Sequence, residues 1–281
     1  MKLVRFGSAG AERPGVVTPD GSIADLGGVI ADVAGAALSP DSLKQVAALD
    51  TGKLPRVAPG TRIGPCVGGV GKFIAIGLNY ADHAAETGAK IPAEPIVFMK
   101  ATSCIVGPND TVLKPRGSTK MDWEVELGFV IGWVARYVSE ADAPKYIAGY
   151  CVINDLSERQ FQLERGGQWD KGKGCDTFGP LGPWLVTPDE VGDPASLSMW
   201  LDVNGQRRQT GSTRTMIFKP HFLVSYLSQF MSLHPGDVIT TGTPPGVGMG
   251  IKPQPVFLNA GDVMELGIEK LGSQRQVVAA A

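Results

Sequence analysis

The sequence predicts a β-rich fold of the α+β class, with one large domain preceded by a smaller unit. Thirty-seven glycines and 21 prolines are spread over 281 residues without a fixed period, which favours many tight turns between short strands over a helical bundle. Hydrophobic residues make up 43% of the chain, which is enough for a sizeable core. Many apolar runs, such as residues 73–77, have the length of a single strand. These observations indicate an enzyme-like fold of short strands and few helices.

Residues 1–70 are predicted to form a small N-terminal domain. Residues 1–6 alternate like a strand, and residues 15–17, followed by a turn at 19–22, complete a predicted β-hairpin. A helix is expected to start after Ser39, before Pro55 and Pro59 break its pattern. The stretch 59–71, rich in glycine and proline, marks the boundary to the large domain, residues 71–281.

The large domain reads as strands with a few helices between them. Strands are expected at 73–77, 95–99, 110–113, 121–132, 147–155, 197–203 and 238–241. Helices are expected at 78–86, 141–146, 156–164 and 221–231. Residues 165–176 are too rich in glycine and charge for a regular element, and a long loop of this kind is more often functional than not.

Composition excludes several classes of partner. With 26 basic and 28 acidic residues, the chain offers no surface for a polyanion, so no nucleic acid is expected. No apolar run approaches the roughly 20 residues of a membrane span, so no membrane is expected either. The four cysteines lie far apart without a C-x-x-C pair, and the N-terminus has no charged-then-apolar leader. We therefore expect a reducing compartment, the cytoplasm.

Glu124 and Glu126 stand out in the predicted strand 121–132. Because alternate residues of a strand point to the same face, these two side chains are expected to project together. Their apolar neighbours indicate a strand that is covered on both faces. Neighbouring carboxylates in such a place must be protonated, paired or bound to a metal. The alternative is an edge strand with a solvated acidic face.

Asp155 adds a third carboxylate at the end of the predicted strand 147–155. Three carboxylates suit Mg²⁺, Mn²⁺ or Ca²⁺ rather than zinc, which prefers histidine or cysteine at short spacing. A hard ion with three protein ligands keeps open positions for water or a chelating substrate, as catalytic sites require. The alternative role for Asp155 is to cap the helix predicted at 156–164.

Three further features have the chemistry of an active site. His83 and Glu86, three positions apart on a predicted helix, can form a base oriented by a carboxylate, or an ordinary surface pair. Lys171 and Lys173 can reach an anion from the glycine-rich loop, or can be solvated loop charges. Thr243 lies in the turn-rich loop 242–248, which is suited to present backbone amides or a hydroxyl to an anionic group.

In the order in which they occur along the chain, these motifs resemble those of the fumarylacetoacetate hydrolase family over residues 70–270. The resemblance rests on Asn-Tyr-x-x-His-x-x-Glu at 79–86, Glu-x-Glu at 124–126, the strand-terminal Asp155, the loop lysine and Thr-Gly-Thr-Pro-x-Gly-Val-Gly at 241–248. Within it, residues 157–180 are similar to a bacterial branch that acts on sugar-derived 2,4-diketo-3-deoxy acids and is often labelled ureidoglycolate lyase. The resemblance implies a mixed β-roll or β-sandwich-like catalytic domain behind a small N-terminal domain. It also implies a homodimer, with Mg²⁺ or Mn²⁺ as cofactor.

The resemblance further implies a role for each matching residue. The matches are three metal ligands (Glu124, Glu126, Asp155), a water-activating dyad with an active-site lysine (His83, Glu86, Lys173) and three substrate-contacting residues (Arg159, Gln162, Thr243). The spacing from Trp169 favours Lys173 over Lys171. Lys100 receives no role, because Ala101 follows it where the family often has proline.

The activity implied is metal-dependent hydrolysis of the C–C bond of a small 2,4-diketo acid, a sugar-derived one, to pyruvate and a carboxylic acid. Alternatives at the same metal site are a 2-oxo acid decarboxylase, a hydratase, an isomerase or a ureidoglycolate lyase-type activity. A binding module without activity is disfavoured, because the ligands, the dyad and the lysine occur together.

Overall fold

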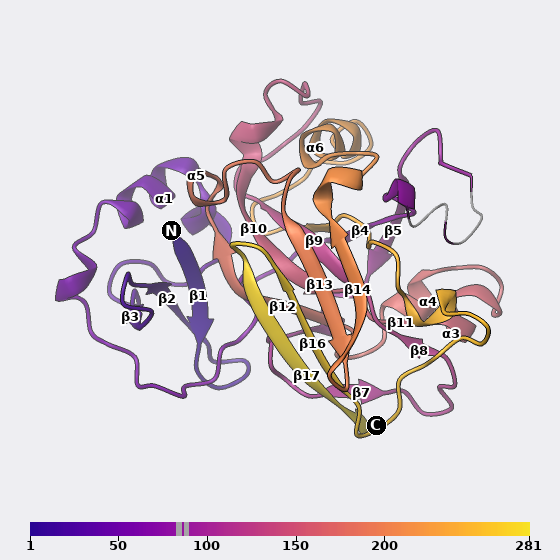
Figure 1. Cartoon of the computed structure of the whole chain (residues 1–281). Helices are drawn as coiled ribbons and strands as arrows, with labels where there is room; N and C mark the ends of the chain where they lie inside the picture. The colour runs from indigo at the N-terminus through magenta and orange to yellow at the C-terminus, as the bar shows by residue number, and fades with distance from the viewer. Residues whose placement is uncertain (83–85, 87–89) are drawn as a thin grey trace.

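The computed structural model describes residues 1–82, 86 and 90–281, and three sheets organise it (Figure 1). The largest is a mixed sheet of ten strands in the order β3-β2-β1-β12-β10-β9-β15-β4-β5, with β6 paired to β12. Its strands are β1 (Lys2–Phe6), β2 (Arg13–Val17), β3 (Ile23–Asp25), β4 (Phe73–Gly77), β5 (Ile96–Lys100), β6 (Ile105–Val106), β9 (Val125–Ile131), β10 (Ile147–Asn154), β12 (Gly179–Val186) and β15 (Val238–Thr240). The prediction of a β-rich fold with few helices is confirmed.

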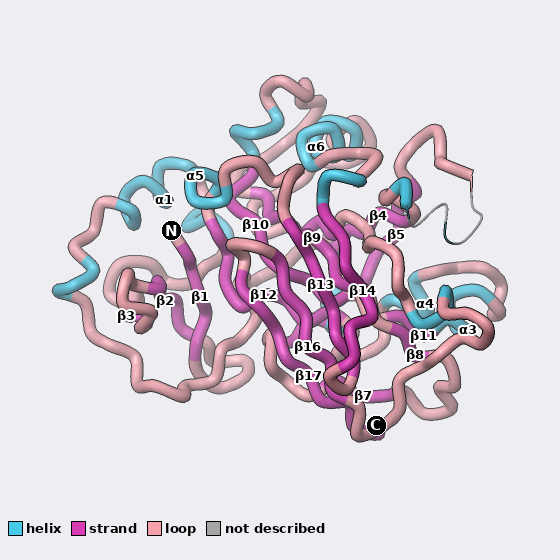
Figure 2. The backbone as a smooth tube through the Cα atoms, in the orientation of Figure 1, coloured by secondary structure: helices cyan, strands magenta, loops and turns pink. Residues whose placement is uncertain are grey.

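A second sheet has five strands and packs against the first. Its order is β14-β13-β16-β17-β7, with bounds β7 (Val112–Lys114), β13 (Ser198–Val203), β14 (Gln206–Ser212), β16 (Val263–Ile268) and β17 (Gly272–Ala280). Figures 1 and 2 show β13, β16 and β17 lying across β9, β10 and β12. Every residue of β9 and β10 is buried, so these two central strands are covered on both faces.

The N-terminal residues extend the large sheet. The predicted hairpin is present as the antiparallel pair β1 and β2, and β1 also pairs with β12 through Lys2 and Val186. Helix α1 (Pro40–Ala47) begins after Ser39, whose Oγ accepts a hydrogen bond from the Ser42 amide at 3.3 Å. The division of the chain at residue 70 stays a prediction.

The predicted strand 121–132 is interrupted, which corrects the expectation of one continuous strand. β8 (Met121–Asp122) pairs with β11 (Ser157–Glu158) in a separate two-stranded sheet, and the chain enters the large sheet only at Val125. Two contacts redirect the backbone between them: the Trp123 amide donates to Asp122 Oδ1 at 2.8 Å, and the Glu124 amide donates to Asn154 Oδ1 at 3.2 Å. Glu124 therefore lies between two strands, while Glu126 lies within β9.

The helices are short and differ in their bounds from those predicted. Besides α1, the described residues form α3 (Arg159–Leu163), α4 (Asp170–Lys173), α5 (Pro188–Val191), α6 (Pro220–Leu227) and the 3₁₀ turns Gly35–Leu38, Thr51–Lys53, Thr102–Cys104, Ala143–Tyr146, Thr213–Thr215 and Gly248–Gly250. The residue that caps α3 is Glu158, which accepts from the Gln160 amide at 3.1 Å, so the alternative of Asp155 as a helix cap is wrong. Lys173 lies on α4 rather than in an irregular loop. In the described part of the chain, no helix has the length and apolar character needed to cross a membrane.

Candidate active site

Three carboxylates meet where β9 and β10 run side by side. The two strands are antiparallel, with Ile153 opposite Glu126, and the Asp155 amide donates to the Glu124 carbonyl at 2.9 Å. This register brings Asp155, just past β10, next to Glu124 and Glu126. One oxygen from each of the three carboxylates lies within 4.8 Å of the other two, and all three side chains are buried.

Glu126 is held from the neighbouring strand β15 and the loop after it. The Thr240 hydroxyl donates to Glu126 Oε2 at 2.5 Å, and the Gly242 amide donates to the same oxygen at 2.8 Å. Burial and the charges of Asp155 and Glu124 hold the pKa of Glu126 well above its usual range. Without a further cation, a negative charge on Glu126 is therefore unfavourable.

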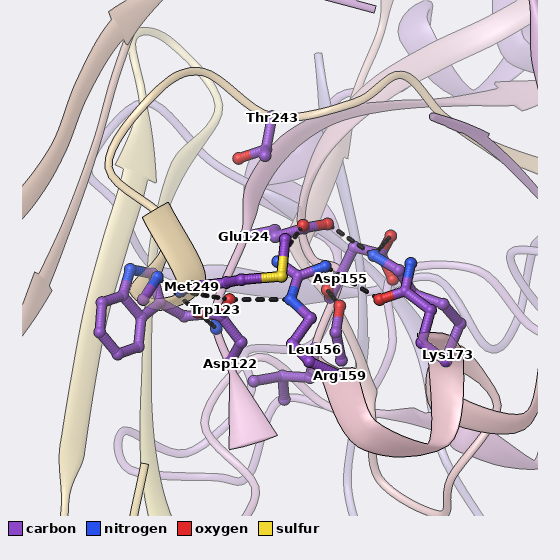
Figure 3. A network of polar contacts seen from close by, with 12 residues as sticks. Asp122, Trp123, Glu124, Asp155, Leu156, Arg159, Lys173, Thr243 and Met249 are labelled. Carbon is purple, nitrogen blue, oxygen red and sulfur yellow. Dashed lines mark hydrogen bonds and ion pairs between the residues drawn. The ribbon is translucent and has the colours of Figure 1, made fainter. Parts of the chain in front are cut away.

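Lys173 links the other two carboxylates (Figure 3). Its Nζ donates to Glu124 Oε2 at 2.6 Å and to Asp155 Oδ2 at 2.7 Å. Burial alone would lower the pKa of Lys173, but the charges of Asp155 and Glu124 outweigh burial and raise it, so the ammonium stays charged. Helix α4 reaches this position because Gly172 has no side chain: a Cβ there would lie 2.6 Å from the Gln162 Cβ.

Arg159 holds the outer side of Glu124. Its Nη2 donates to Glu124 Oε1 at 2.5 Å, its Nε to Asp122 Oδ2 at 2.8 Å and its Nη1 to Gln162 Oε1 at 3.1 Å. Burial acts to raise the pKa of Glu124, but Arg159 and Lys173 outweigh it and hold that pKa well below its usual range. Arg159 and Gln162 thus lie side by side at the edge of the carboxylate cluster.

Lys100 approaches Asp155 from β5 behind the cluster. Its Nζ forms an ion pair with Asp155 Oδ1 at 2.5 Å and also donates to the main-chain carbonyls of Leu156 and Lys173. Nevertheless, Asp155 Oδ1 receives no hydrogen bond of acceptable geometry from the described residues, although it is fully buried. Apart from the Lys100 ion pair, this oxygen therefore has acceptor capacity left for a further partner.

The cluster fits a hard divalent cation. Its three central ligands offer only oxygen atoms, which Mg²⁺ and Mn²⁺ prefer, and one of those oxygens lacks a hydrogen bond. Among the described residues, four carboxylates (Asp122, Glu124, Glu126, Asp155) meet only three cations (Lys100, Arg159, Lys173) in this network. The ion would be held by Glu124, Glu126 and Asp155.

The other predicted site residues are distributed differently. His83 lies outside the described residues. The Glu86 carboxylate accepts from the Gly246 amide at 3.1 and 3.3 Å, so it contacts the loop that follows β15. The Thr243 hydroxyl donates to the Val125 carbonyl at 2.8 Å and fixes that loop to β9. Lys171 is exposed and donates to the Arg165 carbonyl, away from the cluster.

A cavity of about 200 Å³ opens onto the carboxylates. It is lined by Ile76, Gly77, Leu78, Phe98, Glu124, Glu126, Asp155, Arg159, Gln162, Leu163, Trp169, Lys173, Gly242, Thr243 and Met249. Seven of the nine residues assigned to the site from the sequence line this cavity: Glu124, Glu126, Asp155, Arg159, Gln162, Lys173 and Thr243. A small molecule can therefore reach the candidate ion ligands directly.

Sequence reasoning missed Asp122, which connects the cluster to the loop over it. Asp122 is fully buried, and besides Arg159 it accepts from the Gly248 amide at 2.6 Å and the Met249 amide at 3.0 Å. Figure 3 shows Asp122 between Arg159 and Met249. An aspartate in an apolar strand next to the two glutamates was the available signal.

We expect Asp122→Asn to destabilise the protein by about 3 kcal/mol, because it removes the charge that compensates the buried Arg159. The measurement is the free energy of unfolding in urea. The matched control is Asp142→Asn, which breaks an exposed ion pair with Lys145 and should change the stability little. Equal losses in the two variants would contradict the role of Asp122.

Comparison with known sequences points to one family. The profile of the family described as Fumarylacetoacetate (FAA) hydrolase C-terminal matches residues 72–279. A protein of Burkholderia multivorans, named only as a candidate hydrolase, is 62% identical over 281 residues, and the match covers the full length of both chains. A relative from Burkholderia ambifaria with the same kind of name is 62% identical over 276 residues, with 98% of both chains covered.

Solved structures agree with this result. The fumarylacetoacetate hydrolase of Exiguobacterium antarcticum is 35% identical, with a TM-score of 0.86 and complete coverage of both chains. Maleylpyruvate hydrolase of Sphingobium sp. SYK-6, in complex with manganese(II) and pyruvate, is 30% identical, with a TM-score of 0.83 and complete coverage of both chains. A 5-carboxymethyl-2-hydroxymuconate delta-isomerase of Mycobacterium smegmatis is 31% identical, with a TM-score of 0.76, covering all of this chain and 99% of that one.

Proposed function

Because this chain belongs to the fumarylacetoacetate hydrolase family, we propose that it is a metal-dependent hydrolase that cleaves the C–C bond of a 2,4-diketo acid. Water adds to the C4 carbonyl carbon, the C3–C4 bond breaks, and C3 gains a proton. The products are pyruvate and a carboxylic acid, so atoms and charge balance. The observation that carries the proposal is the cluster of three buried carboxylates with Lys173 and Arg159 at its edge.

The proposed cofactor is Mg²⁺ or Mn²⁺. When bound, the ion supplies a Lewis acid that holds a chelating 2-oxo acid and stabilises negative charge on its oxygens. The manganese and pyruvate in the maleylpyruvate hydrolase structure support this choice for a protein of the same family.

Lys173 and Arg159 have hydrogen-bond donors left for a substrate. An ammonium has three N–H donors, and Lys173 uses two of them on Glu124 and Asp155. We assign the third to the C4 carbonyl oxygen, where negative charge develops as water adds. A guanidinium has five N–H donors, and Arg159 uses three on protein groups. The remaining two, with Gln162, are assigned to orienting the substrate.

His83 is proposed to take the proton from the attacking water, and Glu86 to stabilise the imidazolium that results. The contact between Glu86 and the Gly246 amide supports the proposal, because it holds Glu86 against the loop 242–248, whose residues Gly242 and Thr243 line the cavity.

We expect His83→Ala to lower turnover by about 100-fold or more, the size of a lost general base, while Mn²⁺ still binds. Turnover is measured on 2,4-diketo acids, and ion binding by calorimetry. His221→Ala, at the start of α6, is the matched control and should retain wild-type turnover. Full activity in the His83 variant would remove the dyad from the mechanism.

The proposed substrate is a sugar-derived 2,4-diketo-3-deoxy acid, which residues 157–180 support through their similarity to that branch of the family. A panel of 2,4-diketo acids of five to seven carbons, sugar-derived ones included, with Mg²⁺ or Mn²⁺, tests this choice. The homodimer and the cytoplasmic location stay predictions.

An isomerase is the second candidate, favoured by the likeness to the isomerase structure from Mycobacterium smegmatis. Isomerisation needs the ion but no attacking water. Conversion of an unsaturated 2-oxo acid without release of a carboxylic acid would favour it over hydrolysis, and release of carbon dioxide from oxaloacetate would instead indicate a decarboxylase.

A further inference from the structure

The cavity over the carboxylates has two unlike sets of lining residues. One set comprises the candidate ion ligands with Arg159, Gln162 and Lys173. The other set is apolar: Ile76, Leu78, Phe98, Leu163, Trp169 and Met249. A ligand whose 2-oxo acid group is held by the first set has the apolar set available to the rest of its chain.

The apolar set starts next to the active-site lysine and continues away from the cluster. Lys173 Nζ lies 5.4 Å from the centre of the Phe98 ring, and the Phe98 and Trp169 rings meet edge to face at 5.2 Å. Trp169 in turn packs on the backbone of β4, where a Cβ at Gly77 would lie 2.5 Å from its Cζ3 atom. Ile76 and Leu78, the neighbours of Gly77, also line the cavity, and we call its six apolar lining residues (Ile76, Leu78, Phe98, Leu163, Trp169 and Met249) the acyl wall.

The cations of the cavity are committed to the carboxylate cluster. The described lining residues include two cations, Arg159 and Lys173, and both are paired with carboxylates of the cluster. The positions outside the described residues, 83–85 and 87–89, read His-Ala-Ala and Thr-Gly-Ala and so add no lysine or arginine, and the one histidine among them is assigned to the attacking water. A carboxylate placed against the acyl wall would lose its hydration without gaining a lysine or arginine partner.

We propose that the substrate carries a single carboxylate, on its pyruvate half, and that its acyl half is uncharged and packs against the acyl wall. This inference rests on the proposed function and narrows its substrate class. It excludes diketo diacids and favours, among the sugar-derived acids proposed above, those whose acyl half carries few hydroxyl groups. The small volume of the cavity, about 200 Å³, also favours a short acyl half.

Binding of a matched pair of compounds tests the inference apart from catalysis. 2-Oxoheptanoate and 2-oxoheptanedioate have the same number of carbons and lack the C4 carbonyl, so neither can be hydrolysed between C3 and C4. They differ in a methyl group against a carboxylate at the far end. With Mn²⁺ present, calorimetry should give a Kd at least about tenfold lower for the monoacid. Equal or tighter binding of the diacid would overturn the inference.

Turnover separates this inference from the proposed function. The enzyme should cleave 2,4-dioxoheptanoate with a kcat/KM at least about tenfold above that for 2,4-dioxoheptanedioate. Equal cleavage of both would overturn the inference and leave the proposed hydrolysis standing. Cleavage of neither, and of no other acid in the panel described above, would overturn the proposed hydrolysis, and the binding preference would then decide the inference.

A cation added to the acyl wall should shift the preference. Leu163 is 45% exposed, so Leu163→Lys can fold, and it should reduce the preference for the monoacid several-fold in binding and in turnover. Val29→Lys is the matched control: Val29 is 44% exposed but does not line the cavity, so this variant should keep the wild-type preference. An unchanged preference in Leu163→Lys would count against the acyl wall as the site of the acyl half.

Discussion

Glu126→Gln will abolish tight divalent-ion binding and leave the ion-free protein at least as stable as the wild type. The carboxylate of Glu126 is buried beside the charges of Asp155 and Glu124, so its neutral amide analogue removes repulsion in the empty site. The same change removes one of the three oxygen ligands proposed for the ion. Ion affinity should fall by more than about 100-fold. Changing a residue that only supports a metal ligand costs about 10- to 100-fold, and the loss of the ligand itself should cost more.

The measurement combines calorimetric titration with Mn²⁺ and thermal unfolding in EDTA and in excess Mn²⁺. Thr240→Val is the matched control, because it removes only the hydroxyl that donates to Glu126 Oε2 and should weaken ion binding by about 10- to 100-fold. If the Glu126→Gln variant binds Mn²⁺ as tightly as the wild type, the assignment of Glu126 as a ligand is refuted.

Lys173→Met is expected to have the opposite effect on the empty protein. Removing the ammonium leaves Glu124 and Asp155 buried without their shared partner, which should destabilise the ion-free protein by about 3 to 5 kcal/mol. Turnover should fall by about 100- to 1,000-fold with saturating ion, the cost of losing a donor to a developing oxyanion. Added Mn²⁺ should restore much of the lost stability, because the cation replaces the missing charge.

Urea unfolding with and without Mn²⁺ and steady-state kinetics check this prediction. Lys171→Met is the matched control, since Lys171 is exposed and contacts the Arg165 carbonyl rather than the cluster. It should retain the stability and turnover of the wild type. If the two lysine variants behave alike, Lys173 has no special part in the site.

Much of the site could be predicted because its residues break a local rule. Glu124, Glu126 and Asp155 are charges in apolar strands, and burying such charges without a partner is costly enough to require an explanation. The apolar runs likewise predicted β9 and β10, which are buried on both faces. Arg159 and Gln162 were matched through the family resemblance, and they lie three positions apart on α3.

The rest depends on contacts between distant parts of the chain, which no local pattern encodes. Asp122 binds the Gly248 amide 126 positions away, and Lys100 reaches the Lys173 carbonyl 73 positions away. The interruption of the strand between Asp122 and Val125 has the same origin, because the Glu124 amide donates a hydrogen bond to the side chain of Asn154 from β10. A periodic apolar sequence predicts a strand there, and a tertiary hydrogen bond ends it.

The charge balance of the cluster bears on the order in which ligands bind. Because the pKa of Glu126 is held well above its usual range, the other three carboxylates of the described network are balanced by its three cations, and the empty site has no excess positive charge to attract an anion such as a 2-oxo acid. A divalent cation reverses that balance, and the same buried site then attracts the anion. If the proposed ion binds, we therefore expect sequential binding, with the cation first and the acid second. During steady turnover the organic ligands should exchange many times for each exchange of the metal.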